Sequence, residues 1–345
     1  MTQATFAFGL GLGTQNSKGD WLDTFYPSPL LNPKADLVSA VQSIVTSLQG
    51  NTAVAVTSAQ MAQIADVIAA SDNAEQAAIA AQLATGNQPL VVTLLSSDDA
   101  PSSVPEGYLK LHLLSHRLVK PHSINLTGLF GVLPNVAWTN QGAVDISELQ
   151  QRQLQARLKG EMLEVMSVDK FPKMTNYVVP TGVRIAHTAR VRLGAYLGEG
   201  TTIMHEGFVN FNAGTEGPGM IEGRISAGVM VGSGSDLGGG CSTMGTLSGG
   251  NNVIISVGKE CLIGANAGVG IPLGDRCTIE AGLYITAGSV LTMIDAEGAV
   301  AGTSKARDLS GQSDLLFRRN SKNGAIEVLT NKSAIALNEM LHAHN

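Results

Sequence analysis

The sequence predicts a mainly β protein: a parallel β-helix preceded by an α/β domain and followed by a short C-terminal cap. The first observation is an aliphatic residue that returns every six positions between Val183 and Leu291. The second is that glycine, another small residue or a turn former usually follows it, as in Leu197-Gly198. A period of six fits neither an amphipathic helix nor an isolated strand, but it fits stacked coils in which each unit supplies one short strand and one corner.

The repeat continues through two gaps and one slip of four residues. Its aliphatic positions are Ile185, Val191, Leu197, Ile203, Ile225, Val231, Leu237, Val257, Ile263, Val269, Leu273, Ile279, Ile285 and Leu291. We expect these side chains to point inward, while glycine, alanine or asparagine allows tight corners at little steric cost. Of the 40 glycines, 27 lie between Gly182 and Gly302, interleaved with aliphatic residues, which is typical of a repeat and not of low complexity.

The 345 residues are long enough for several domains. We predict an α/β N-terminal domain over 1–180, the β-helix over 181–300 and a C-terminal cap over 301–345. The cap contains a basic stretch and a final helix near 333–342. A cap is expected because the open end of a solenoid exposes unpaired backbone groups.

Local signals place the elements of the N-terminal domain. Helices are predicted over 34–48, 58–70, 73–83, 106–118 and 146–158, and a strand over 90–95. The helix over 106–118 is expected to be amphipathic, and Asp145 is expected to cap the last helix. The run Gly9–Gly13 is interpreted as a flexible turn, because its third glycine comes one residue too early for a dinucleotide-binding fingerprint.

Composition excludes several classes of protein. The formal net charge of −6 argues against a nucleic-acid partner, which would need a basic face. No apolar run is long enough to span a membrane and Met1–Ala7 lacks a signal-peptide pattern, so we expect a cytoplasmic protein without a membrane partner. Cys241, Cys261 and Cys277 lie among small or aliphatic residues inside the repeat, which predicts buried, reduced thiols.

The two interruptions of the repeat, 210–219 and 243–252, are where we expect a site, because loops on one face of a solenoid carry function. Beside the first, Glu222 could act as a nucleophile or general base, and the guanidinium of Arg224 suits a carboxylate. Alternatively, these two side chains form a surface ion pair of little energetic value. The basic C-terminal stretch could bind phosphates or be a solvated run of charge.

Several runs together resemble the longer form of tetrahydrodipicolinate N-succinyltransferase, a family of the lysine pathway. The runs are 191–197, 204–215, 222–224, 249–250, 264–268 and 315–321, with 108–122 and 169–179 in the N-terminal domain. The resemblance implies a left-handed parallel β-helix and a homotrimer with active sites between neighbouring subunits. It also implies transfer of a succinyl group from succinyl-CoA to the amine of ring-opened tetrahydrodipicolinate.

The resemblance assigns roles to particular residues. It implies that Glu222 is catalytic, either through an acyl-anhydride on its carboxylate or by assisting direct attack of the amine. Contacts to CoA and the succinyl group are implied at Arg224, Gly239, Ser242, Ala265, Glu280, Ala281, Gly288, Lys305, Arg318, Arg319, Asn320 and Ser321. Some members hold a structural magnesium ion near the trimer axis through two carboxylates. Glu206 matches one of these ligands, and Ala189, which cannot bind a metal, takes the place of the other. A structural magnesium ion at the trimer axis would then require the Glu206 side chains of three subunits to gather around it.

Three alternatives stay open at this point. One is another CoA-dependent acyltransferase of this repeat class that acts on a small amine. A second is a metal hydratase on the same fold, which needs three histidines around zinc, whereas the repeat offers His187 and His205. A third is a non-catalytic solenoid that acts as a binding module, which would not need Glu222, Arg224 and the basic cap together.

Overall fold

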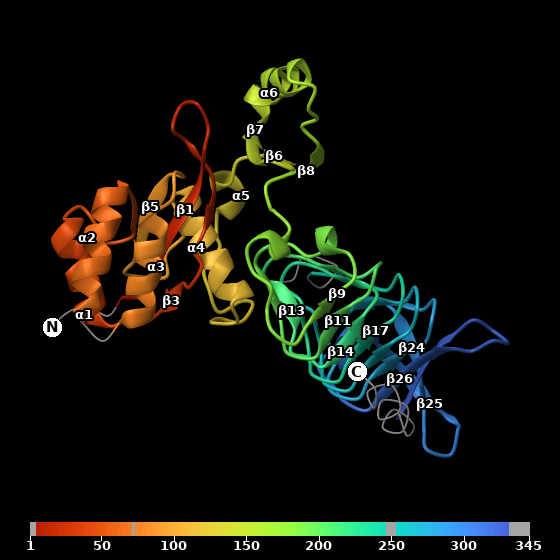
Figure 1. The fold of residues 1–345 in the computed structure, drawn as a ribbon. Coiled ribbons are helices and arrows are strands. Elements are labelled where there is room, and N and C mark those ends of the chain that lie inside the picture. The colour runs from red at the N-terminus through yellow and green to blue at the C-terminus, as the bar shows by residue number, and fades with distance from the viewer. Residues whose placement is uncertain (1–4, 71–72, 246–252, 331–345) are drawn as a thin grey trace. The chain divides into compact units, whose positions relative to one another are not determined.

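The structure, a computed structural model, describes most of the chain. The described residues are 5–70, 73–245 and 253–330. They form two compact units, an α/β unit and a unit of stacked coils (Figure 1). The first unit comprises Met1–Val119 and Ser123–Pro172, and the second comprises Lys120–His122 and Lys173–Asn345. The predicted boundaries after residues 180 and 300 stay predictions.

A five-stranded antiparallel sheet, in the order β2-β1-β5-β4 with β3 paired to β1, is the centre of the first unit. Its strands are β1 (Ala7–Gln15), β2 (Trp21–Phe25), β3 (Leu30–Leu31), β4 (Thr52–Val56) and β5 (Leu90–Leu95). The accompanying helices are α1 (Ala35–Ile44), α2 (Ser58–Ala69), α3 (Ala74–Ala84), α4 (Val104–Ser115) and α5 (Leu129–Val132). Apolar side chains from the sheet and from α1, α2 and α3 form one core.

A smaller antiparallel sheet, β7-β6-β8, completes this unit. It consists of β6 (Val136–Thr139), β7 (Gly142–Asp145) and β8 (Val165–Asp169), and α6 (Ile146–Leu158) connects β7 to β8. The predicted cap of this helix is confirmed, since the Asp145 side chain accepts a hydrogen bond from the Ser147 amide at 2.8 Å. The predicted strand over 90–95 is also confirmed, and α2 and α3 each lie within one residue of their predicted bounds.

Two predictions for the first unit are wrong. The run Gly9–Gly13 is not a turn but the middle of β1, where a Cβ on Gly13 would lie 2.2 Å from the carbonyl oxygen of Asp23. Its glycines therefore serve close packing of strands. The helix predicted over 106–118 ends at Ser115 and is not amphipathic, because its side chains from Pro105 to Ser115 are all buried.

The second unit is a left-handed parallel β-helix with three faces. The first face contains β9 (Arg184–Ile185), β11 (Thr201–Ile203), β14 (Gly219–Ile221), β17 (Asp236–Leu237), β20 (Leu262–Ile263), β22 (Thr278–Ile279) and β26 (Leu315–Arg319). The second face contains β12 (Phe208–Val209), β15 (Arg224–Ile225), β18 (Ser242–Thr243), β21 (Gly268–Gly270) and β23 (Tyr284–Thr286). The third contains β10 (Ala195–Leu197), β13 (Ala213–Thr215), β16 (Met230–Val231) and β19 (Ser256–Val257).

The six-residue period explains the coil. Thr202 pairs with Arg184, so this turn of the solenoid uses the 18 residues from 184 to 202, which is three units of six. The repeated aliphatic residues point inward, as predicted, and most of them are fully buried. Parallel in-register pairing of successive coils provides the backbone hydrogen bonds that such short strands cannot form alone.

The first predicted interruption, 210–219, is wrong, because the coil continues through it. Strand β13 pairs in register with β10, and β14 pairs with β11. Thr215 occupies the inward position and is fully buried, while its hydroxyl accepts a hydrogen bond from the Gly217 amide at 3.1 Å. A satisfied threonine therefore replaces the expected aliphatic residue. The irregularity lies instead at Glu222–Arg224. Here the spacing between inward residues is four, from Ile221 to Ile225, instead of six.

The second interruption is an insertion between β18 and β19. Arg224 pairs with Ser242 across 18 residues, whereas Ser242 pairs with Gly268 across 26. Most of the inserted segment, including Gly249-Gly250, lies outside the described residues.

The end of the solenoid is closed by strands. These are β24 (Val290–Ile294), β25 (Val300–Lys305), β26 and β27 (Ile326–Thr330). Strand β26 adds to the first face in parallel with β22 and then pairs antiparallel with β27. The predicted final helix near 333–342 lies outside the described residues. Among those that are described, no helix is both long and apolar enough to cross a membrane.

Candidate functional site

One edge of the β-helix collects most of the residues singled out from the sequence. It consists of the turns that lead from the first face to the second, and we call it the Glu222 corner. Its turns are 186–190, 204–207, 222–223, 238–241, 264–267 and 280–283, and residues 320–321 follow β26 at the same edge. Backbone hydrogen bonds connect successive turns, for example from Asn266 N to Gly239 O at 2.9 Å and from Gly282 N to Ala265 O at 2.8 Å.

The structure brings many of the predicted coenzyme contacts together on this corner. Those in its turns are Gly239, Ala265, Glu280 and Ala281, while Arg319 ends β26 at the same edge and Asn320 and Ser321 follow it. Arg224 and Ser242 lie beside the corner, paired on adjacent strands of the second face. Gly288, Lys305 and Arg318 lie elsewhere: Gly288 follows β23, Lys305 ends β25, and Arg318 lies in β26.

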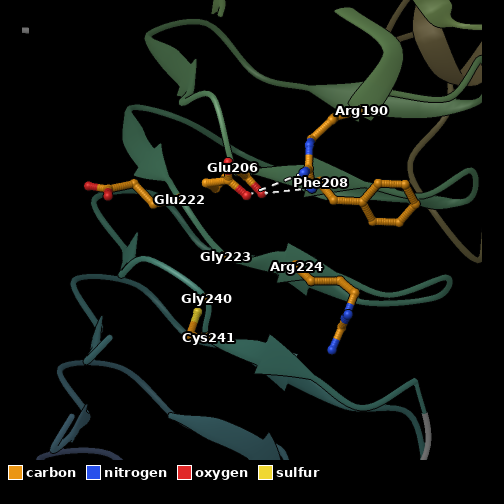
Figure 2. A pocket seen from close by; sticks show the side chains of 8 residues that line it. All are labelled: Arg190, Glu206, Phe208, Glu222, Gly223, Arg224, Gly240 and Cys241. Atoms are coloured by element: carbon orange, nitrogen blue, oxygen red, sulfur yellow. Dashed lines mark hydrogen bonds and ion pairs between the residues drawn. The ribbon is translucent and has the colours of Figure 1, made fainter. Parts of the chain in front are cut away.

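A cavity of about 460 Å³ opens at the Glu222 corner (Figure 2). Its lining residues are Arg190, Glu206, Phe208, Glu222, Gly223, Arg224, Gly240 and Cys241. The cavity therefore combines two guanidinium groups and two carboxylates with a small apolar and glycine-lined surface. Such a mixture suits a short, charged, flexible ligand.

Glu222 has an unshared carboxylate. Its backbone amide donates to Leu237 O at 2.8 Å, which fixes the turn after β14. No ion pair joins it to any cation within the described part of the chain. The surface ion pair considered from the sequence is therefore wrong, and Figure 2 shows Glu222 and Arg224 pointing in different directions.

Arg224 is held by a neutral partner instead. Its Nε donates to Ser242 Oγ at 3.2 Å, and its Nη2 donates to the same oxygen at 2.9 Å. Because a guanidinium carries five N–H donors and a hydroxyl brings no negative charge, Arg224 keeps both its charge and further donors for an anion.

Arg190 and Glu206 form an ion pair at the other end of the cavity (Figure 2). Arg190 Nη2 lies 3.2 Å from Glu206 Oε2, and His205 Nδ1 lies 3.1 Å from Glu206 Oε1. Of the two carboxylates implied for a magnesium site, this chain has Glu206, which pairs with Arg190, and it has Ala189 in place of the other. In the described part of the chain, no three His, Cys, Asp or Glu side chains gather to hold a metal ion.

Cys241 contributes an inert wall to the cavity. Burial raises the pKa of its thiol to about 12; nearby Arg224 opposes this effect and Glu222 adds to it. The thiol is therefore protonated at neutral pH and is not the nucleophile of this cavity. The prediction of buried, reduced thiols is confirmed for Cys241, Cys261 and Cys277.

Sequence reasoning missed Arg190, Phe208 and the wall formed by Cys241. The signal for Arg190 is its register on the coil: Val191 pairs with Val209, so Arg190 takes the position that Phe208 takes one coil later. Phe208 pairs directly with Arg224 across neighbouring strands. Both could have been found by placing the sequence on a coil of known length.

The basic C-terminal residues differ in how they are used. Arg318 Nε donates to Glu327 Oε2 at 2.9 Å. The exposed Arg319 side chain donates instead to a backbone oxygen, that of Gly324, at 3.3 Å. Lys305 lines a separate open hollow of about 600 Å³ together with Arg307.

Comparison with known proteins identifies the family. Family models match at 38–131 (tetrahydrodipicolinate N-succinyltransferase N-terminal), 133–173 (the middle region of the same family) and 254–287 (hexapeptide repeat of succinyl-transferase). Proteins named 2,3,4,5-tetrahydropyridine-2,6-dicarboxylate N-succinyltransferase are similar over the whole chain: one from Pseudomonas putida is 67% identical over 100% of both chains. Another, from Vibrio cholerae, is 58% identical over 99% of this chain and 100% of its own.

A solved structure gives the same result. A protein from Campylobacter jejuni, described as a 2,3,4,5-tetrahydropyridine-2-carboxylate N-succinyltransferase, superimposes with a TM-score of 0.89 at 32% identity, covering 96% of this chain and 94% of its own. The relatives share essentially full length, so the agreement includes the N-terminal unit as well as the β-helix. This chain therefore belongs to the tetrahydrodipicolinate N-succinyltransferase family.

Proposed function

We propose that this chain transfers the succinyl group of succinyl-CoA to the amine of ring-opened tetrahydrodipicolinate, with Glu222 as the catalytic residue. The product is N-succinyl-2-amino-6-oxopimelate, and the second product is free CoA. The observation that carries this proposal is the Glu222 corner, where Arg224 shares one cavity with a carboxylate that pairs with no cation of the described residues, at the head of a column of small residues.

The chemistry requires one bond to form and one to break. The neutral amine nitrogen attacks the thioester carbonyl carbon, a C–N bond forms, the C–S bond breaks, and the sulfur leaves as a thiolate. The nitrogen must lose a proton and the sulfur must gain one. Because no cation of the described chain occupies the Glu222 carboxylate, this group can accept the proton from nitrogen and return it to sulfur.

Arg224 supplies the anion site for the acyl group. A succinyl thioester ends in a carboxylate, and a guanidinium that is held by Ser242 Oγ at 2.9 Å is oriented without being neutralised. We therefore assign to Arg224 and Ser242 the preference for a dicarboxylic acyl group.

The coenzyme arm is proposed to lie along the Glu222 corner toward the C-terminal coils. From the strand before Glu222 to β26 there are four steps along the first face, roughly 19 Å at the usual strand spacing. The small residues Gly239, Ala265 and Ala281 leave room for a narrow chain along this path, and Arg319 lies at its far end.

Family membership also supports two broader proposals. We propose that the protein acts as a homotrimer, with the cavity completed by a neighbouring copy, and that it works in the cytoplasm on small-molecule substrates. Sedimentation equilibrium of the purified chain tests the first of these, and a mass other than three chains would contradict it.

The reaction itself is tested by the release of CoA thiol. Purified protein and succinyl-CoA should release thiol only when the amino diacid is added, and mass spectrometry should find the succinylated amine. A burst of one thiol per site without the amine would instead indicate an acyl-anhydride on Glu222. Folded trimer that releases no thiol in response to the amine would contradict the proposed function.

A further inference from the structure

Arg190 lies on the opposite side of Glu222 from the proposed coenzyme residues of the corner. It ends the short helix η2 (Thr188–Arg190), two turns before Glu222, whereas Gly239 and the turns after it follow on the other side. Along a parallel solenoid the order of turns in the sequence is also their order in space. A thioester that reaches Glu222 from the C-terminal coils therefore leaves the N-terminal side of the cavity for the other reactant.

The partners of Arg190 can be exchanged at little cost. Nη1 and Nη2 of its guanidinium donate to the backbone oxygen and Oε2 of Glu206, at 3.3 Å and 3.2 Å, which are long for charge-assisted hydrogen bonds. Both side chains of this pair are accessible, with 39% of Arg190 and 65% of Glu206 exposed. Exposed ion pairs contribute little stability, so a ligand carboxylate can take the place of Glu206.

We propose that Arg190 binds the carboxylate of the amine substrate that is remote from the reacting amine, and so selects an amino dicarboxylic acid. This inference rests on the proposed function. Among the described residues, Arg190 and Arg224 are the two cations lining the cavity, and the acyl group is proposed to occupy Arg224. The acceptor has two carboxylates and must react through an uncharged amine. The guanidinium of Arg190 is left as the counterion for one of these carboxylates.

The dimensions indicate which carboxylate is bound. Two steps between coils separate the turns of Arg190 and Glu222 by roughly 10 Å. In an extended seven-carbon diacid, the remote carboxylate lies roughly 6 Å from the carbon bearing the amine, given carbon–carbon bonds of about 1.5 Å. The arginine and glutamate side chains cover the rest of this separation. The carboxylate next to the amine remains beside Glu222.

The first test is steady-state kinetics of Arg190→Ala. We expect the KM for the amino diacid to rise at least tenfold, while the KM for succinyl-CoA stays within twofold of the wild type. Arg184→Ala, which removes an exposed arginine of β9 that does not line the cavity, should change neither constant. Wild-type turnover in the same assay tests the proposed function separately, so an active wild type with an unchanged variant would overturn this inference alone.

Removal of Arg190 also leaves the Glu206 carboxylate without its cation, close to Glu222. A second variant distinguishes this effect from the loss of substrate binding by Arg190. Arg190→Ala with Glu206→Gln removes the freed carboxylate as well. If Arg190 binds substrate, the KM of this double variant stays raised; a return to the wild-type value would assign the effect to Glu206 and overturn the proposal.

Two competitive inhibitors then identify the group that is bound. They are the saturated seven-carbon α-amino diacid and the α-amino monoacid that lacks the remote carboxylate. In Arg190→Ala the inhibition constant of the diacid should rise at least tenfold, and that of the monoacid should be unchanged. Equal weakening of both inhibitors would overturn the assignment to the remote carboxylate.

Discussion

At the scale of single residues, the defining feature is a carboxylate that has room around it and no partner in the described chain. Glu222 lies in the shortened, four-residue spacing between Ile221 and Ile225. The neighbouring Gly239 brings no side chain near it: a Cβ there would lie 3.5 Å from Glu222 Oε2. The local sequence thus leaves space where a solenoid would usually place another side chain. This arrangement is costly for packing and useful for chemistry.

The Glu222→Gln variant should lose catalysis without losing its fold. The amide keeps the size of the side chain but cannot take a proton, so kcat should fall by roughly 10² to 10⁴. Thermal unfolding should stay within a few degrees of the wild type, because this half-buried side chain makes no ion pair in the described chain. The kcat of the variant is measured as the rate of thiol release at saturating concentrations of both substrates.

A matched variant makes that result specific. Glu260→Gln changes an exposed glutamate on a different corner of the same solenoid, and it should keep wild-type kcat. Retention of more than a tenth of the activity by Glu222→Gln would remove Glu222 from the proton transfer.

Arg318 and Arg319 are adjacent in sequence but should respond differently to truncation. Arg319→Ala should raise the KM for succinyl-CoA several-fold with little change in stability, because its exposed side chain makes no ion pair within the described residues. Arg318→Ala should mainly lower the melting temperature, because it leaves the buried Glu327 without its cation. Paired measurements of KM and melting temperature check this; an opposite assignment of the two effects would contradict the proposed coenzyme path.

At the scale of the elements, the corner itself can be probed with two glycines. A Cβ on Gly264 would lie 2.4 Å from the backbone nitrogen of Ala281, whereas a Cβ on Gly239 would meet only Glu222 Oε2 at 3.5 Å. Gly264→Ala should therefore destabilise the coil by about 1–3 kcal/mol, the usual cost of overpacking. Gly239→Ala should fold normally and bind succinyl-CoA more weakly, since its methyl group enters the proposed path.

Melting curves and CoA titrations of both proteins provide the comparison. Similar melting temperatures for the two variants would show that the corner turns tolerate displacement. Unchanged CoA binding by Gly239→Ala would place the coenzyme elsewhere.

The elements also indicate how far sequence reasoning reaches. The period of six predicted the coil, because inward aliphatic side chains leave a direct trace in the sequence. Thr215 escaped that pattern, since a hydroxyl satisfied by the Gly217 amide fills an inward position as well as a methyl group does. The strand at Gly9–Gly13 was also not predicted, because strands that approach closely and flexible turns both favour glycine.

The site was predictable only in part for a related reason. Glu222 and Arg224 stand out because they interrupt the period, whereas Arg190 belongs to a different coil and is brought near by register alone. Which residues lie side by side on neighbouring coils follows from the number of residues in each coil. That number changes at the shortened spacing of Glu222–Arg224 and at the insertion after Ser242, so both must be known before the coils can be aligned.

At the scale of the whole molecule, acid should act on the two units differently. Burial lowers the pKa of His112 from 6.5 to about 3. Its ring is fixed as a neutral imidazole, with Nδ1 against the Tyr108 oxygen at 2.8 Å and Nε2 accepting from the Tyr26 amide at 3.3 Å. Since the unfolded state binds the proton first, this stability is complete above pH 6.5 and is lost as the pH falls toward 3.

Tryptophan fluorescence isolates this effect, because both tryptophans, Trp21 and Trp138, belong to the first unit. Urea unfolding should show stability falling by up to about 1.4 kcal/mol per pH unit between pH 6 and 4 for each such histidine. His112→Gln should flatten this slope but not abolish it, because burial also lowers the pKa of His116. His205→Gln, at an exposed position, serves as the control; an unchanged slope in His112→Gln would contradict the assignment.

The order of turns along the Glu222 corner has one more consequence. Acceptor contacts are proposed before residue 207, the reacting carboxylate at 222, and donor contacts from 224 onward, so each task belongs to its own stretch of chain. Exchange of a single coil between family members, matched in register, should therefore transplant preference for one reactant and leave the other untouched. In this architecture each substrate preference belongs to a separate segment of the sequence. Recombination at the corners can therefore change the substrate of the enzyme in one step.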